Sequence, residues 1–216
     1  MKQFVVIGLG RFGSSVACNL AESGYDVLAI DVDEERVQNI MDTVTHAVEA
    51  DATDEKALNS LGVSNFDVGV VSIGNNIHAS ILATLILKEM GVPYVVTKAI
   101  DDLHGKVVTR VGADRVVYPE QDMGTRIARN LISTNVLDYI EFAPDYSVIE
   151  IIPPEKMIGK SLAELDLRSK YNVNVMAIKR GEHMNMAPGA EDKILENDII
   201  IIMGKNEYLD RVKEME

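Results

Sequence analysis

The chain has 216 residues, 47% hydrophobic and 25% charged, which is enough for one large domain or two small ones with a buried core. A formal net charge of -13 at pH 7, without any Lys/Arg run, argues against binding to nucleic acid or to anionic lipid surfaces. The single cysteine, Cys18, excludes an internal disulfide and a cysteine metal cluster, and no apolar run reaches the roughly 18 residues of a membrane span, so we expect a cytoplasmic protein.

The first predicted element is a short buried strand over residues 4–7, which leads directly into the sequence GLGRFG at residues 8–13 and then into a helical pattern. In such a unit Gly8 makes the tight turn, Gly10 lets a phosphate approach the backbone, and Gly13 lets the helix pack close to the sheet. The next strand-like run ends in Asp31, whose carboxylate can accept hydrogen bonds from ribose hydroxyls. The spacing predicts a nucleotide site, the alternative being a glycine-rich turn without a ligand.

Six short apolar runs alternate with helical patterns through the first two-thirds of the chain, which predicts a Rossmann-like, doubly wound parallel α/β sheet. The expected strands cover residues 4–7, 27–30, 47–50, 68–73, 94–97 and 115–118. The expected helices cover residues 11–22, 34–43, 55–61, 77–90, 103–111 and 123–133. We expect Asp33 and Thr53 to cap the second and third of these helices.

The expected helix at residues 77–90 has too many apolar positions for one buried stripe. Two alternatives stay open for it: burial between the sheet and a neighbouring helix, or a subunit interface. Its apolar positions are Ile77, Ile81, Leu82, Leu85, Ile86 and Leu87. After Thr134 and Asn135, the apolar residues Val136, Leu137 and Ile140 predict a second short helix that leads out of the first domain.

A change of character at residues 142–145 marks a second unit. Its expected strands cover residues 147–152, 173–178, 183–186 and 199–203, with one helix at 162–171 and another from residue 207. We therefore expect two domains, residues 1–134 and a small α+β domain of residues 135–216.

Ligands of an open α/β sheet lie beyond the carboxyl ends of its strands, so the residues at the strand tips predict the site. They are Arg11, Asp31, Val32, Asp33, Asp51, Ala52, Ile73, Gly74, Asn75, Lys98, Ala99, Ile100 and Glu120, together with Phe12 in the glycine turn. Arg11 places a planar cation where phosphate charge needs neutralising. Glu120 would repel phosphates unless a bound cation bridged them, which predicts a divalent ion.

The groups that would consume a nucleotide are not evident in the sequence. It contains no GxSxG, no GxxxxGK[ST] loop and no HExxH spacing, and its four histidines are dispersed. The second unit is also too small for the substrate domain of a dehydrogenase. These observations favour a protein that binds a nucleotide without transforming it, with an NAD-dependent oxidoreductase of unknown substrate as the alternative.

Several segments together resemble a known family. The segments VIGLGRFG, DVDEE, VVSIGNNIHAS, VTKAIDDLHGKV and RVVYPEQDMG are similar to the N-terminal RCK domain of the KTN/TrkA-type regulatory subunits of Ktr/Trk potassium uptake systems, and LAELDLRSKYNVNVMAIKRG with DIIIIMG to the RCK C-terminal domain. The resemblance implies a regulatory subunit that is not an enzyme, in which ATP favours the active state and ADP the inactive one, and which also accepts NAD(H). It further implies homodimers that assemble into an octameric ring, peripheral to the inner face of the membrane, beneath a potassium-translocating membrane subunit.

The resemblance also implies roles for individual residues. Arg11 would reach the terminal phosphate, including that of a nucleotide in the neighbouring subunit, Asp31 would hold the ribose, and Asp51 and Ala52 would flank the adenine. His104 and Glu120 would lie at the phosphate end, Glu120 through a cation, while Ile100 departs from the family pattern because a polar residue is more usual there. Cyclic di-AMP would bind the C-terminal domain at Asp166, Leu167, Arg168, Asn174, Val175 and Pro188, with ordinary helix and strand surface as the alternative.

Overall fold

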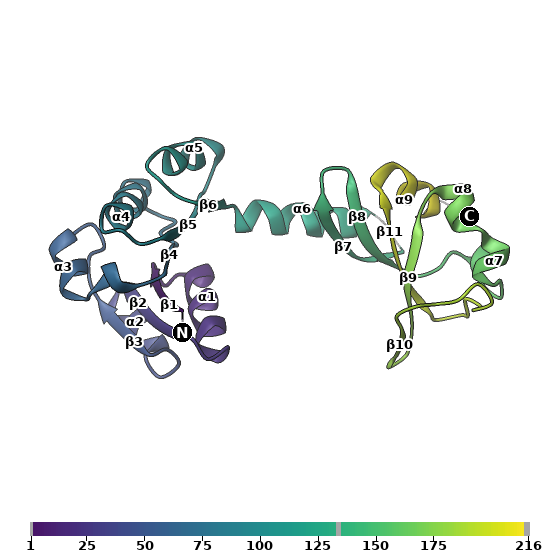
Figure 1. Cartoon of the computed structure of the whole chain (residues 1–216), viewed down its shortest axis with the longest axis horizontal. Coiled ribbons are helices and arrows are strands. Elements are labelled where there is room, and N and C mark those ends of the chain that lie inside the picture. The colour runs from purple at the N-terminus through teal and green to yellow at the C-terminus, as the bar shows by residue number, and fades with distance from the viewer. Residues whose placement is uncertain (1, 133–134, 214–216) are drawn as a thin grey trace. The chain divides into compact units, whose positions relative to one another are not determined.

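Residues 2–132 and 135–213 are described by the computed structural model, and the backbone divides into two units, Met1–Glu120 and Gln121–Glu216 (Figure 1). Residue 134, at the predicted domain boundary, lies outside the described ranges, so the domain limits 1–134 and 135–216 stay a prediction. No helix within the described ranges is both long and apolar enough to cross a membrane.

The first unit is built on a six-stranded parallel sheet with the strand order β3-β2-β1-β4-β5-β6, which confirms the Rossmann-like fold. Its strands are β1 (Gln3–Ile7), β2 (Asp26–Asp31), β3 (His46–Glu49), β4 (Val68–Val71), β5 (Tyr94–Lys98) and β6 (Arg115–Val117). Its helices are α1 (Arg11–Glu22), α2 (Glu34–Ile40), α3 (Glu55–Ser60), α4 (Ile77–Glu89) and α5 (Asp102–Arg110), with a 3-10 turn at Val63–Asn65.

Both faces of this sheet are buried, as the continuous apolar strands predict. Along β1, Val5 and Ile7 point into a core that contains Leu58 of α3 and Leu87 of α4. Val6 points the other way, into a core formed with α1 and α2. Backbone hydrogen bonds join the carboxyl ends of the central strands: Gly8 N donates to Ile30 O (2.8 Å), and Ser72 N donates to Ile7 O (2.7 Å).

The second unit contains a five-stranded antiparallel sheet with the order β10-β9-β11-β8-β7. Its strands are β7 (Val136–Ala143), β8 (Tyr146–Ile151), β9 (Asn174–Arg180), β10 (His183–Asn185) and β11 (Ile199–Lys205). Its helices are α7 (Leu162–Leu165), α8 (Leu167–Tyr171) and α9 (Asn206–Lys213), with a 3-10 turn at Glu155–Met157, and α6 (Pro119–Ile132) links the two units along the chain. Ile149, Ile151, Ile200 and Ile202 form its core with Leu209 of α9.

Three local predictions were wrong, apart from small differences at the ends of elements. The short helix expected around Val136–Ile140 is strand β7, because pairing with β8 (Tyr139 opposite Ile149) decided the structure where the apolar spacing alone was ambiguous. The single helix expected over 162–171 is split at Asp166, which adopts a left-handed conformation (φ 47°) between α7 and α8. Asp54, not Thr53, caps α3, whereas Asp33 caps α2 as predicted.

Helix α4 is only partly covered within one chain. Among its apolar residues Ile86 and Leu87 are buried, whereas Ile77 and Leu82 are 37% and 45% exposed. Burial by the sheet therefore explains part of the apolar pattern, and the subunit interface stays a prediction for the rest.

Candidate functional site

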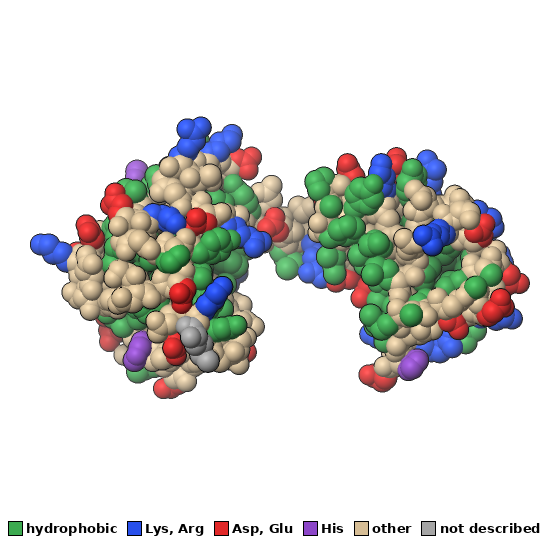
Figure 2. All heavy atoms as spheres, in the orientation of Figure 1, with side chains coloured by type: hydrophobic (Ala, Val, Ile, Leu, Met, Phe, Trp, Pro, Cys, Tyr) green, Lys and Arg blue, Asp and Glu red, His purple; other side chains and the backbone are tan. Residues whose placement is uncertain are grey.

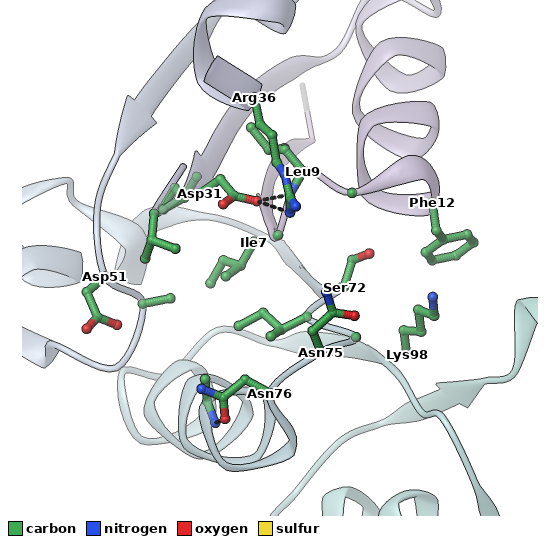
Figure 3. A pocket seen from close by; sticks show the side chains of 18 of the residues that line it. Ile7, Leu9, Phe12, Asp31, Arg36, Asp51, Ser72, Asn75, Asn76 and Lys98 are labelled. Atoms are coloured by element: carbon green, nitrogen blue, oxygen red, sulfur yellow. Dashed lines mark hydrogen bonds and ion pairs between the residues drawn. The ribbon is translucent and has the colours of Figure 1, made fainter. Parts of the chain in front are cut away.

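A cavity of about 860 Å³ opens at the carboxyl ends of the first unit's strands, next to the switch in strand order between β1 and β4 (Figure 3). This volume lies within the range of small-molecule sites, roughly 300–1,000 Å³. The cavity brings together most of the predicted site: Gly8, Gly10, Arg11, Phe12, Asp31, Val32, Asp51, Ala52, Ile73, Gly74, Asn75, Lys98 and Glu120.

The glycine turn has the geometry of an anion site. Gly8 has φ +90°, a conformation that favours glycine, and an added Cβ would lie 2.9 Å from the carbonyl carbon of Ser72. A Cβ on Gly13 would overlap the carbonyl oxygen of Gly8, so the close packing of α1 requires glycine there. Helix α1 starts after Gly10, which provides no side-chain cap, so the first N–H groups of this helix have no capping side chain and suit an anion.

Asp31 is fixed at the end of β2 by the glycine turn itself. Its side chain is only 6% exposed, and Oδ2 accepts a hydrogen bond of 2.5 Å from Leu9 N while Oδ1 accepts one of 3.0 Å from Asp33 N. Arg36 Nη1 lies 3.6 Å from Oδ2 (Figure 3). Because each carboxylate oxygen can accept two hydrogen bonds, acceptor capacity remains for ribose hydroxyls.

The opposite end of the cavity carries the charged groups expected near phosphates. Lys98 Nζ lies 2.5 Å from Glu120 Oε1 and 6.0 Å from the centre of the Phe12 ring. The hydrogen bond from Lys98 lowers the pKa of Glu120, and the charges of Lys98 and Arg11 lower this pKa further, against the opposing effect of burial. Glu120 is therefore ionised and already paired. Among the described residues no group of three or more Asp, Glu, His or Cys could hold a metal ion.

The third part of the cavity lies at the end of β3. Asp51 Oδ1 accepts hydrogen bonds of 2.8 Å from both the backbone N and the hydroxyl of Thr53, and these bonds lower the pKa of Asp51, the backbone one most. This locks the short loop in which buried Ala52 presents an apolar surface. Such a wall suits a planar base, with Asp51 at its rim.

Five residues predicted for the site do not line the cavity: Gly13, Asp33, Ala99, Ile100 and His104. Ala99 and His104 are each only 2% exposed. His104 Nδ1 accepts a 3.4 Å hydrogen bond from Ile100 N, and burial lowers the pKa of His104, so this ring is a neutral, packed group in the single chain. A phosphate contact from His104 stays a prediction.

The sequence analysis missed cavity residues that could contact a ligand, above all Ser72 and Arg36. The Ser72 hydroxyl is buried and has no hydrogen-bond partner among the described residues. It was overlooked because strand β4 was expected to run to residue 73, whereas it ends at Val71 and leaves Ser72 at the tip. Arg36 was overlooked because it lies inside a helix, where arginine is ordinary surface.

Of the six residues predicted for cyclic di-AMP, Asn174 is the one that lines either of the two cavities found among the described residues. Leu167 is 3% exposed and belongs to the core of the second unit. Asn174 lines a smaller cavity of about 320 Å³ with Phe142, Tyr146 and Asn172. The remaining four residues, Asp166, Arg168, Val175 and Pro188, do not line it. This site stays a prediction.

Comparison with known proteins gives matches over both units. The TrkA-N domain family model matches residues 4–119, and the TrkA-C domain model matches residues 147–215. The chain is 48% identical over 203 residues to the Ktr system potassium uptake protein C of Bacillus subtilis (strain 168), a match that covers 94% of this chain and 92% of the relative. It is 45% identical over 210 residues to the Ktr system potassium uptake protein A of the same organism, covering 97% and 95%.

A solved structure with the same fold is the RCK domain of GsuK, with a TM-score of 0.54 and 22% identity over 100% of this chain. The chain spans just under half, 47%, of that structure's chain.

Proposed function

This chain belongs to the family of proteins with TrkA-N and TrkA-C domains, and we propose that it is the regulatory subunit of a Ktr-type potassium uptake system. The observation that carries the proposal is a nucleotide-sized cavity with a glycine turn and a ribose carboxylate, in a chain similar over almost its whole length to Ktr potassium uptake proteins. In this proposal the nucleotide is a signal and the protein is not an enzyme.

ATP and ADP are the proposed regulatory ligands, and NAD(H) is a further ligand of the same cavity. Arg11, Lys98, the Ser72 hydroxyl and the N-terminus of α1 would bind the phosphates, while Asp31 would bind the ribose. A terminal phosphate would compete with Glu120 for Lys98, so that a triphosphate and a diphosphate leave this ion pair in different states. A ligand can shift an equilibrium only through such a difference in its contacts with the two states.

A divalent cation at Glu120 is part of the proposal. Magnesium commonly combines one or two carboxylates with substrate phosphate oxygens and water, so a single glutamate next to a triphosphate fits this ion. Glu120 is 68% exposed in its side chain and is ionised, as a ligand must be. The cation would then be bound only together with the nucleotide.

We also propose that homodimers assemble into an octameric ring beneath a membrane potassium-translocating subunit, on the cytoplasmic side. Apolar residues exposed in the single chain support an assembly, since large apolar patches mark interaction surfaces. Met123, Ile127 and Leu131 of α6 are 50%, 51% and 81% exposed at a spacing of four residues. Hydrophobic side chains also gather over the β7–β8 hairpin (Figure 2). Cyclic di-AMP at a dimer interface of the second domain is a proposal of the same kind.

Calorimetry with ATP, ADP and NADH tests the proposal on the full chain. Arg11→Ala should weaken ATP binding more than ADP binding, because it removes a charge near the terminal phosphate, and Asp31→Ala should weaken all three. Light scattering with ATP and then ADP should show a ring of several dimers. Steady oxidation of NADH with a carbonyl substrate, or a monomer without affinity for adenine nucleotides, would contradict the proposal.

A further inference from the structure

The ribose end of the cavity contains both side chains by which Rossmann-like folds recognise a ribose. An acidic residue after the second strand binds a free 2′-hydroxyl, whereas a nearby arginine accommodates a 2′-phosphate. Here Asp31 and Arg36 both line the cavity. The two signals contradict each other in the sequence, and only the three-dimensional arrangement decides between them.

In the structure Arg36 is held between two carboxylates. Its Nε lies 3.2 Å from Asp33 Oδ2 and its Nη1 lies 3.6 Å from Asp31 Oδ2. Asp33 cannot easily turn away, because its other oxygen caps α2 by accepting hydrogen bonds from Glu35 N (3.1 Å) and Arg36 N (3.4 Å). The positive charge of Arg36 is therefore already matched, and the cluster as a whole carries one net negative charge.

We propose that this cluster makes the site selective for adenine nucleotides whose 2′-hydroxyl is free, with Asp33 as the specificity-determining residue. Asp33 does not line the cavity, but it occupies the guanidinium that a 2′-phosphate would need. A dianionic 2′-phosphate would meet two carboxylates and an arginine that is not available to it. A free ribose needs only the acceptors of Asp31. This inference rests on the proposed binding of adenine nucleotides.

An ordinary explanation of the Arg36–Asp33 pair is a helix surface ion pair between residues three apart, which contributes little. The two explanations differ in what the loss of the Asp33 charge does to ligands. A surface pair leaves ligand discrimination unchanged. A specificity determinant changes the affinity for a 2′-phosphate and leaves the affinity for a free ribose as it was.

The test uses the full chain and two probes that differ only in the 2′-phosphate, AMP and adenosine 2′,5′-bisphosphate, titrated in competition with ADP. The unmodified chain should bind the bisphosphate at least about tenfold more weakly than AMP. Asp33→Asn keeps a helix-capping side chain but removes the charge. It should lower the ratio of the dissociation constants of the bisphosphate and AMP by about tenfold. This is the factor expected when a dianion no longer faces a carboxylate roughly 6 Å away in water-like surroundings. Affinity for ADP and AMP should stay within about twofold.

Two further variants distinguish an effect of the Arg36–Asp33 ion pair from a general effect of removing negative charge. Glu35→Gln removes an exposed negative charge from the same helix and should leave the ratio unchanged. In the double variant Asp33→Asn, Arg36→Gln, the affinity for the bisphosphate relative to AMP should return to that of the unmodified chain. The inference is overturned if the unmodified chain binds the two probes equally, if Asp33→Asn leaves the ratio unchanged, or if Glu35→Gln shifts it as much. Failure of ADP itself to bind would instead overturn the proposed function on which the inference rests.

Discussion

The buried Ser72 hydroxyl offers a prediction with two opposite effects. Ser72 lies at the tip of β4 and lines the cavity, and its buried hydroxyl has no hydrogen-bond partner among the described residues. A buried hydroxyl without a partner costs about 1–3 kcal/mol. Ser72→Ala should therefore stabilise the ligand-free chain by about 1 kcal/mol, which raises the melting temperature by about 2–4 °C for a chain of this size.

The same substitution should weaken nucleotide binding. If the hydroxyl donates to a phosphate, the lost hydrogen bond to a charged group contributes about 1.5–3 kcal/mol, or about ten- to a hundredfold in the dissociation constant. Thermal melts without ligand and ADP calorimetry measure the two effects on one preparation. A more stable protein that binds ADP more weakly is the signature of a hydroxyl kept for a ligand.

Ser80 provides a matched control. Its hydroxyl is also buried without a partner among the described residues, but Ser80 does not line the cavity. Ser80→Ala should stabilise the chain by a similar amount and leave ADP binding unchanged. The reasoning is refuted if Ser72→Ala leaves ADP affinity intact, or if Ser80→Ala lowers it equally.

Three other predictions follow from the contacts. Gly13→Ala should abolish nucleotide binding and destabilise the first unit, because its Cβ would overlap the carbonyl oxygen of Gly8. Gly124→Ala is the control: apart from its own helix backbone, a Cβ there would meet no atom of the described residues within 4 Å, so a melt should show a neutral or slightly stabilising effect. Lys98→Met should leave Glu120 without its partner and weaken ATP binding more than adenosine binding in calorimetry, and equal losses for both would contradict the placement of the phosphates. The hydrogen bond from Arg180 and its charge lower the pKa of Asp198, so the stability from this pair is fully present above the ordinary value of 3.8 and is lost as the pH falls through the lowered pKa. Asp198→Asn should therefore reduce the pH dependence of the free energy of unfolding below about pH 4. An unchanged pH dependence would refute this.

Local patterns in the sequence were sufficient for the framework of the site. The run at residues 8–13 predicted a strand, a tight turn and a helix in that order, because the positive φ of Gly8 and the close contact of Gly13 with the carbonyl oxygen of Gly8 are local demands for glycine. The alternation of apolar runs and helical patterns predicted the parallel sheet. Asp31 followed from the position of a strand end, so its place at the cavity was predictable too.

What the tertiary structure decided were the features set by contacts between distant segments. Strand β7 depends on pairing with β8, and Ser72 became a site residue because β4 ends after Val71. His104 is buried and does not line the cavity. The state of Arg36 depends on two carboxylates at separations of a few ångströms, and the sequence gives their order along the chain but not the distances, which arise only when α2 packs against the end of β2.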